Sequence, residues 1–256
     1  GSPWLGRPPA PAAPQLAPSD QPSMKMLINS HVLYWKPLSF LLRSLVDEAH
    51  FDRWGDVVIV FGGSRADVPP RKVLLPSVGQ EVTFVNVTLN AFDYHGLSAL
   101  WHFRDHPLVR ADSYLYLLET ATVGPRFAAL YANLSAGIRP GEIRRPKGLF
   151  SNICVFGREL PRRWEATYDH NFTKREGLGL ELGGPEFRTH GARPLIGWAK
   201  GDITDLRERV GTGTRDVYNT GFPRYVLYYP DFDLNKYILG GMFGDITDGK
   251  TRPIFP

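Results

Sequence analysis

The sequence has little cysteine, no long apolar run and no block of like charge. Cys154 is the only cysteine among 256 residues, so no internal disulfide can form. No apolar stretch approaches the roughly 18 residues that a membrane-spanning helix needs, and no signal peptide is recognisable. The 30 basic and 26 acidic residues nearly cancel, leaving a formal net charge of +4. Because the basic residues are not clustered, we expect no nucleic-acid partner.

The sequence also lacks the short motifs of several enzyme classes. Neither G-x-x-x-x-G-K-[ST] nor G-x-G-x-x-G occurs, which disfavours a P-loop NTPase and a dinucleotide-binding domain. The absence of G-x-S-x-G and of H-E-x-x-H leaves a hydrolase without a recognisable nucleophile or metal motif to start from.

Three glycosylation acceptor patterns bear on the compartment. They begin at Asn86, Asn133 and Asn171. They favour the secretory pathway, with any membrane anchor removed ahead of this chain. The cytoplasm is the alternative, since the patterns can arise by chance, and Cys154 is typical of a small buried apolar residue in either compartment.

Composition divides the chain into a tail and one domain. Seven of the first 22 residues are proline, which predicts an extended linker or stem over residues 1–22. Residues 24–256 are expected to form a single α/β domain that is regular over residues 24–137 and less regular over residues 138–256.

Apolar patterning predicts alternating strands and helices. The run at 57–61 is continuously apolar and stops at glycines, as expected of a strand covered on both faces. Leucines at helical spacing follow Pro37, which is expected near a helix start. The alternation predicts a three-layer α/β fold with a mostly parallel central sheet. Further strands are expected at 26–31, 82–87, 114–118, 152–156 and 224–229, and further helices after Asp93 and from Phe127.

Candidate site residues follow the predicted strands, because ligands of open α/β sheets bind beyond the carboxyl ends of the strands. They are Gly62-Gly63-Ser64, Asp93 and Glu119-Thr120. The glycine pair fits either close approach of a ligand or a tight turn. Glu119 ends an aromatic-rich strand, where a carboxylate can hold a divalent metal or face a sugar hydroxyl; a capping or solvent-facing charge is the alternative. His95 is expected to be a structural histidine.

This order of elements resembles a glycosyltransferase of the GT-A fold over roughly residues 25–135. The resemblance implies transfer of a sugar from a nucleoside-diphosphate sugar, a UDP-sugar above all, to a hydroxyl of a glycan or glycoprotein. It also implies a nucleotide-binding half at 24–137, an acceptor half at 138–256 and a place in the Golgi lumen. It implies Mn²⁺ or Mg²⁺ as cofactor, with Glu119 as metal ligand and catalytic residue. Gly62, Gly63, Ser64, Asp93 and Thr120 would then contact the nucleotide, and Asp169 or His170 would serve as the base.

One departure from that family's pattern leaves alternatives open. GT-A enzymes usually carry Asp-x-Asp where this chain has Glu119-Thr120-Ala121. The difference fits a glutamate variant, metal-free catalysis or an inactive relative that binds glycans or acts as a scaffold. A literal Asp231-Phe232-Asp233 lies only 23 residues before the end of the sequence, and we interpret it as a turn. Arg224 and Lys236 flank the last strand and could neutralise a diphosphate, but we expect them to be exposed, solvated charges.

Overall fold

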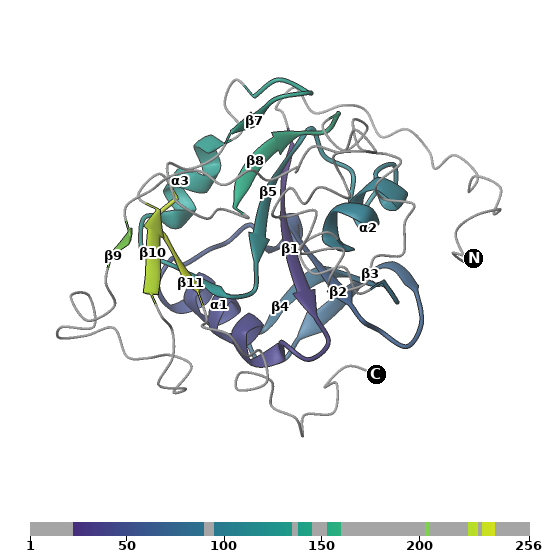
Figure 1. Ribbon diagram of the computed structural model, residues 1–256, viewed down its shortest axis with the longest axis horizontal. Helices are drawn as coiled ribbons and strands as arrows, with labels where there is room; N and C mark the ends of the chain where they lie inside the picture. The colour runs from purple at the N-terminus through teal and green to yellow at the C-terminus, as the bar shows by residue number, and fades with distance from the viewer. Residues whose placement is uncertain are drawn as a thin grey trace, which may run out of the picture.

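The structure is a computed structural model that describes residues 23–89, 95–134, 138–144, 153–159, 203–204, 225–229 and 232–238. A seven-stranded sheet forms its centre, in the order β3-β4-β2-β1-β5-β8-β7 (Figure 1). Neighbours among β4, β2, β1 and β5 run parallel, whereas β3 and β8 pair antiparallel at the flanks. The prediction of a mostly parallel α/β sheet is therefore confirmed. The strands are β1 (Met24–His31), β2 (Val57–Gly62), β3 (Val68–Leu75), β4 (Gln80–Asn86), β5 (Ser113–Leu118), β7 (Ile143–Arg144) and β8 (Cys154–Gly157).

A second, antiparallel sheet of four strands lies beside the first, in the order β6-β11-β10-β9. Its strands are β6 (Ala121–Val123), β9 (Ile203–Thr204), β10 (Tyr225–Tyr229) and β11 (Leu234–Ile238). Since only two residues separate the end of β5 from the start of β6, Glu119 and Thr120 connect the main sheet to the small one.

Helices cover the two faces of the main sheet and bury its apolar side chains. One face packs against α1 (Trp35–Asp47), α3 (Phe127–Leu134) and apolar residues of the small sheet. The other face packs against α2 (His95–Phe103). Every residue of β2 and of β5 is buried, as expected for strands covered on both sides. None of the helices in the described part of the chain is long and apolar enough to span a membrane.

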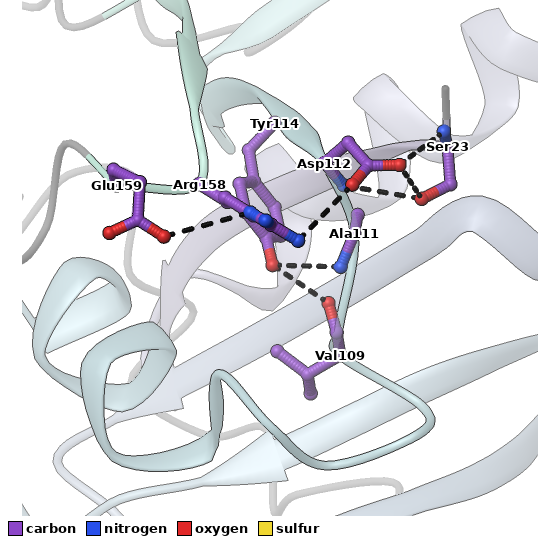
Figure 2. A network of polar contacts seen from close by, with 7 residues as sticks. All are labelled: Ser23, Val109, Ala111, Asp112, Tyr114, Arg158 and Glu159. Atoms are coloured by element: carbon purple, nitrogen blue, oxygen red, sulfur yellow. Dashed lines mark hydrogen bonds and ion pairs between the residues drawn. The ribbon is translucent and has the colours of Figure 1, made fainter. Parts of the chain in front are cut away.

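A polar network connects the ends of three strands at the amino edge of the main sheet (Figure 2). The Asp112 carboxylate accepts hydrogen bonds from the backbone amide and the hydroxyl of Ser23, at 3.0 and 3.1 Å. Arg158, directly after β8, lies 3.5 Å from the same carboxylate. The Tyr114 hydroxyl donates to the Val109 carbonyl, and burial raises the pKa of Tyr114 to about 12. The start of β1 is therefore held to β5 and β8 at the first residue that the structure describes.

Two details of the fold differ from what the sequence predicts. Helix α1 begins at Trp35, two residues ahead of the expected start at Pro37. Strand β3 was not expected, because Pro69 and Pro70 lie within it. It is an edge strand with a bulge between Val68 and Arg71, which is where a sheet tolerates proline.

Candidate functional site

The topology itself marks one crevice in the main sheet. From β1 the chain winds to one side through β2 and β4, and β5 then pairs with the opposite side of β1. The strand order therefore reverses between β1 and β5, and ligands of open α/β folds bind outside the carboxyl ends of the strands at such a point. The carboxyl end of β1 carries Asn29, Ser30 and His31, and the chain leaves β5 at Glu119 and Thr120.

Glu119 and Thr120 are fixed at this crevice by backbone hydrogen bonds. The Glu119 amide donates to the Asn29 carbonyl at 3.3 Å, and the Thr120 carbonyl accepts from the Tyr237 amide at 3.0 Å. Both side chains are 8% exposed. A carboxylate and a hydroxyl are thus held at the edge where a ligand is expected.

Lys236 is the unexpected member of this group. The sequence predicts a solvated charge, but Lys236 is buried, and its ammonium donates a short hydrogen bond to the Thr120 hydroxyl. Strand β11 places it there, since Lys236 pairs with Ala121 of β6. The expectation of exposure is wrong because the sequence alone does not show that two segments 115 residues apart pair in one sheet. Arg224, its predicted counterpart, lies outside the described residues.

The turn Gly62-Gly63-Ser64 lies at the same edge, after β2. Its backbone amides are already in use, since Gly63 donates to the Leu89 carbonyl and Ser64 to the Val87 carbonyl, both at 3.0 Å. A phosphate could bind these amides only by displacing the two carbonyls. The glycines also make room for imidazole rings, because a Cβ at Gly62 would lie 2.6 Å from His95 and one at Gly63 would meet His31. Gly63 has φ of +71°, a backbone angle that other residues rarely adopt.

His95 is a buried structural histidine at the start of α2. Its Nε2 lies 2.5 Å from the Ser30 carbonyl, and because a carbonyl only accepts, Nε2 carries the proton. The Nδ1 atom is buried without a hydrogen-bond partner among the described residues. Burial lowers the pKa of His95 to about 3, despite the opposing effect of the Ser30 carbonyl. His95 is therefore neutral at physiological pH and positions the end of β1.

Asn29 holds the same helix to the sheet from the neighbouring position. Its Oδ1 accepts a hydrogen bond from the Gly96 amide at 2.6 Å, which satisfies one of the amides that a helix N-terminus leaves open. A Cβ at position 96 would clash with this side chain, so the glycine allows the contact. An asparagine at the end of an otherwise apolar strand was the available signal for this role, and the sequence reasoning did not use it.

Asp233, the second aspartate of the literal Asp-x-Asp, holds two elements together. Its carboxylate accepts hydrogen bonds from the Arg126 amide at 2.8 Å and from the Tyr228 hydroxyl at 2.7 Å. Burial alone would raise the pKa of Asp233, but these hydrogen bonds outweigh it, and the pKa lies below the usual range. Asp233 lies in the turn between β10 and β11, so the interpretation of this segment as a turn is confirmed.

The donor set at the crevice fits a divalent cation poorly. The described residues contain no group of three or more histidine, cysteine or acidic side chains that could hold a metal ion. Glu119 supplies a carboxylate, but the adjoining Thr120 hydroxyl is already bonded to an ammonium, whose charge would repel a second cation nearby.

Several predicted site residues cannot be located relative to this crevice. Asp93, Asp169 and His170 lie outside the described residues, as does Asp231. Of the predicted set, the structure brings Glu119 and Thr120 together, with Lys236 bonded to Thr120. It places the turn of residues 62–64 at the same sheet edge, where two histidine rings pack against the glycines.

Comparison with known proteins gives no family assignment. No protein-family model matches the sequence, and no curated protein matches it either. Among solved structures, the chain is similar to a cytidylyltransferase from Leptospira borgpetersenii serovar Hardjo-bovis (strain JB197), with 12% sequence identity and a TM-score of 0.40. The match covers 67% of this chain and 73% of that one. A likeness this low says nothing about activity, so the crevice itself carries the functional inference.

Proposed function

We propose that this chain is a nucleotide-sugar-dependent glycosyltransferase domain whose donor binds at the crevice between β1 and β5. One observation carries the proposal. Buried Glu119 and Thr120 lie at the carboxyl end of β5, directly across the strand-order reversal from the polar end of β1. A carboxylate at this position suits the hydroxyl groups of a ribose or a sugar, and neighbouring cationic groups suit a diphosphate.

The reaction needs two services from the protein. The leaving nucleoside diphosphate must be stabilised as negative charge develops on it, and the acceptor hydroxyl must lose its proton. We assign donor orientation to Glu119, and we keep Asp169 or His170 as the proposed base. If Mn²⁺ or Mg²⁺ bound despite this poorly suited donor set, it would add charge stabilisation at the diphosphate, and Glu119 is the described residue that would contact it. The acceptor is proposed to be a glycan or glycoprotein hydroxyl, encountered in the Golgi lumen.

The test begins with a panel of UDP-, GDP- and CMP-sugars and a thermal-shift measurement, with and without Mn²⁺. We expect at least one donor to raise the melting temperature and to be slowly hydrolysed or transferred. The Glu119→Ala variant should lose at least about tenfold of that turnover, because it removes a group that holds the donor. Glu81→Ala is the matched control, since Glu81 is an exposed carboxylate near the amino end of β4.

The outcomes separate the candidate functions. The proposal is wrong if no donor in the panel binds under either condition. Binding without hydrolysis or transfer would instead identify a non-catalytic glycan-binding or scaffold domain.

A further inference from the structure

We propose that Lys236 binds the diphosphate of the donor and supplies there the positive charge that a divalent metal would otherwise provide. This inference rests on the proposed function and adds to it that donor binding is independent of metal. Its starting point is the burial of Lys236, which is 6% exposed. Lysine is rarely buried, because removing an ammonium from water is costly, and here the bond to the Thr120 hydroxyl holds the group at the crevice.

The position of the ammonium is fixed by the backbone of two strands. Lys236 lies opposite Ala121 in the β6–β11 pairing, and the next residue, Tyr237, donates its amide to the Thr120 carbonyl. The Lys236 ammonium then reaches the Thr120 hydroxyl. The ammonium is therefore fixed beside Thr120, the residue that follows Glu119, before any ligand binds. Charges fixed in advance stabilise a developing anion without a cost of reorganisation.

The chemistry of the group suits a phosphate. An ammonium carries three N–H donors and no acceptor, and lysine binds phosphate as a compact point charge. The hydrogen bond to Thr120 orients the group. A nucleoside diphosphate at the crevice would meet a cation already in place, whereas a divalent ion would meet that cation as a like charge.

Two other described cations that make hydrogen bonds, Arg126 and Lys25, lie away from the crevice. Arg126 is 63% exposed at the side chain and contacts Asp233 and Tyr228. Lys25 lies near the start of β1, at the amino edge of the sheet, where its ammonium donates to the Gly55 carbonyl at 3.3 Å. Lys25 is thus a partly buried lysine at the amino edge of the sheet, away from the crevice, and Lys25→Met is the matched control.

The experiment is isothermal titration of UDP, GDP and inorganic pyrophosphate into wild type, Lys236→Met, Lys236→Arg and Lys25→Met, each in EDTA and in Mn²⁺. We expect wild-type affinity for a nucleoside diphosphate to agree within about twofold between EDTA and Mn²⁺. Lys236→Met should weaken binding by at least about tenfold, the usual cost of losing a charged hydrogen bond. Lys236→Arg should retain part of the affinity, and Lys25→Met should bind as wild type does.

Each contrary result has a distinct meaning. Wild-type binding that requires Mn²⁺, or a Lys236→Met variant that binds as tightly as wild type, would overturn the role of Lys236 while leaving the proposed function intact. If no nucleotide or pyrophosphate binds wild type in either condition, and no nucleotide-sugar in the panel binds either, both proposals fail. The comparison of EDTA with Mn²⁺ uses wild type alone, so it tests whether donor binding is independent of metal even if Lys236→Met does not fold.

Discussion

At the scale of single residues, the glycines of the β2 turn are explained by the rings that lie on them. Gly62 is buried against the His95 imidazole, and Gly63 combines a positive φ with contact to His31. The sequence correctly suggested a special turn at this point. It could not distinguish ligand approach from ring packing, because that depends on which side chain of a distant segment faces the glycine.

We therefore predict that Gly62→Ala lowers the free energy of unfolding by about 1–3 kcal/mol, because the new methyl group would overlap the His95 ring in a packed interior. Urea unfolding followed by circular dichroism measures the effect. Gly55→Ala is the control, since a Cβ there meets nothing within 4 Å. It should be neutral or stabilising by up to about 1 kcal/mol. Equal effects of the two substitutions would contradict the packing explanation.

His95 should make stability depend on pH. Its pKa in the folded protein is about 3, below the ordinary value of 6.5. Between these values the unfolded chain binds a proton that the folded chain does not, so stability must fall as the pH drops below about 6.5. Between pH 7 and pH 5 this loss amounts to about 2 kcal/mol for this one group. Burial of the imidazole is the main cause.

The check is the same unfolding measurement at pH 7 and pH 5 on wild type and His95→Gln. We expect the variant to lose less stability than wild type between the two pH values, whatever its stability at pH 7. Identical losses in the two proteins would show that His95 does not titrate as its burial requires.

At the scale of elements, the sequence predicts the buried strands well and the edges poorly. The strands β2 and β5 are recognisable in the sequence as continuous apolar runs, because both faces of each strand are covered. Strand β3 has prolines and exposed charges, and only its pairing with β4 makes it a strand. The burial of Lys236 likewise depends on the pairing of β11 with β6, which no local pattern encodes.

Asp233 illustrates how one side chain holds two elements together. Its carboxylate connects the turn of the β10–β11 hairpin to Arg126, just ahead of α3. We predict that Asp233→Ala lowers the free energy of unfolding by about 1–3 kcal/mol, because two hydrogen bonds are lost and a partly buried amide loses its partner. Asp233 has φ of +49°, and asparagine tolerates that backbone angle better than alanine does.

Asp233→Asn should therefore be the milder substitution, and Tyr228→Phe should cost only the part carried by one hydrogen bond. Thermal and urea unfolding of the three variants give the order. If Asp233→Asn destabilises the protein as much as Asp233→Ala does, and Mn²⁺ stabilises only wild type, the literal Asp-x-Asp would be a metal site instead.

At the scale of the whole molecule, the described contacts begin at Ser23. Ser23 is held by Asp112 at the amino edge of the sheet (Figure 2). The candidate site lies at the opposite, carboxyl edge. The composition of residues 1–22 predicts a linker. Deleting these residues should therefore shift the melting temperature by no more than about 1 °C. Asp112→Ala in the shortened chain should lower the free energy of unfolding, but by no more than about 1 kcal/mol, because the contacts of Asp112 are exposed.

Differential scanning fluorimetry of the two chain lengths checks this prediction. A large drop on removal of residues 1–22 would show that the tail is part of the folded domain.

The α/β class, the parallel core and the position of Glu119-Thr120 at the end of a strand could all be reasoned from the sequence, because they depend on local apolar patterns and on where strands end. The placement of Lys236 and Asp233 could not, since each is set by contacts with residues more than 100 positions away.

The central claim is that a nucleotide-sugar donor binds where β1 and β5 end, beside Glu119 and Lys236. A crystal of the protein soaked with UDP, once with Mn²⁺ and once with EDTA, tests it most directly. The account predicts nucleotide density at the carboxyl ends of β1 and β5 in both soaks, with the diphosphate within hydrogen-bond distance of the Lys236 ammonium. Density beside Asp233 at the β10–β11 turn, or none at either place, would contradict it.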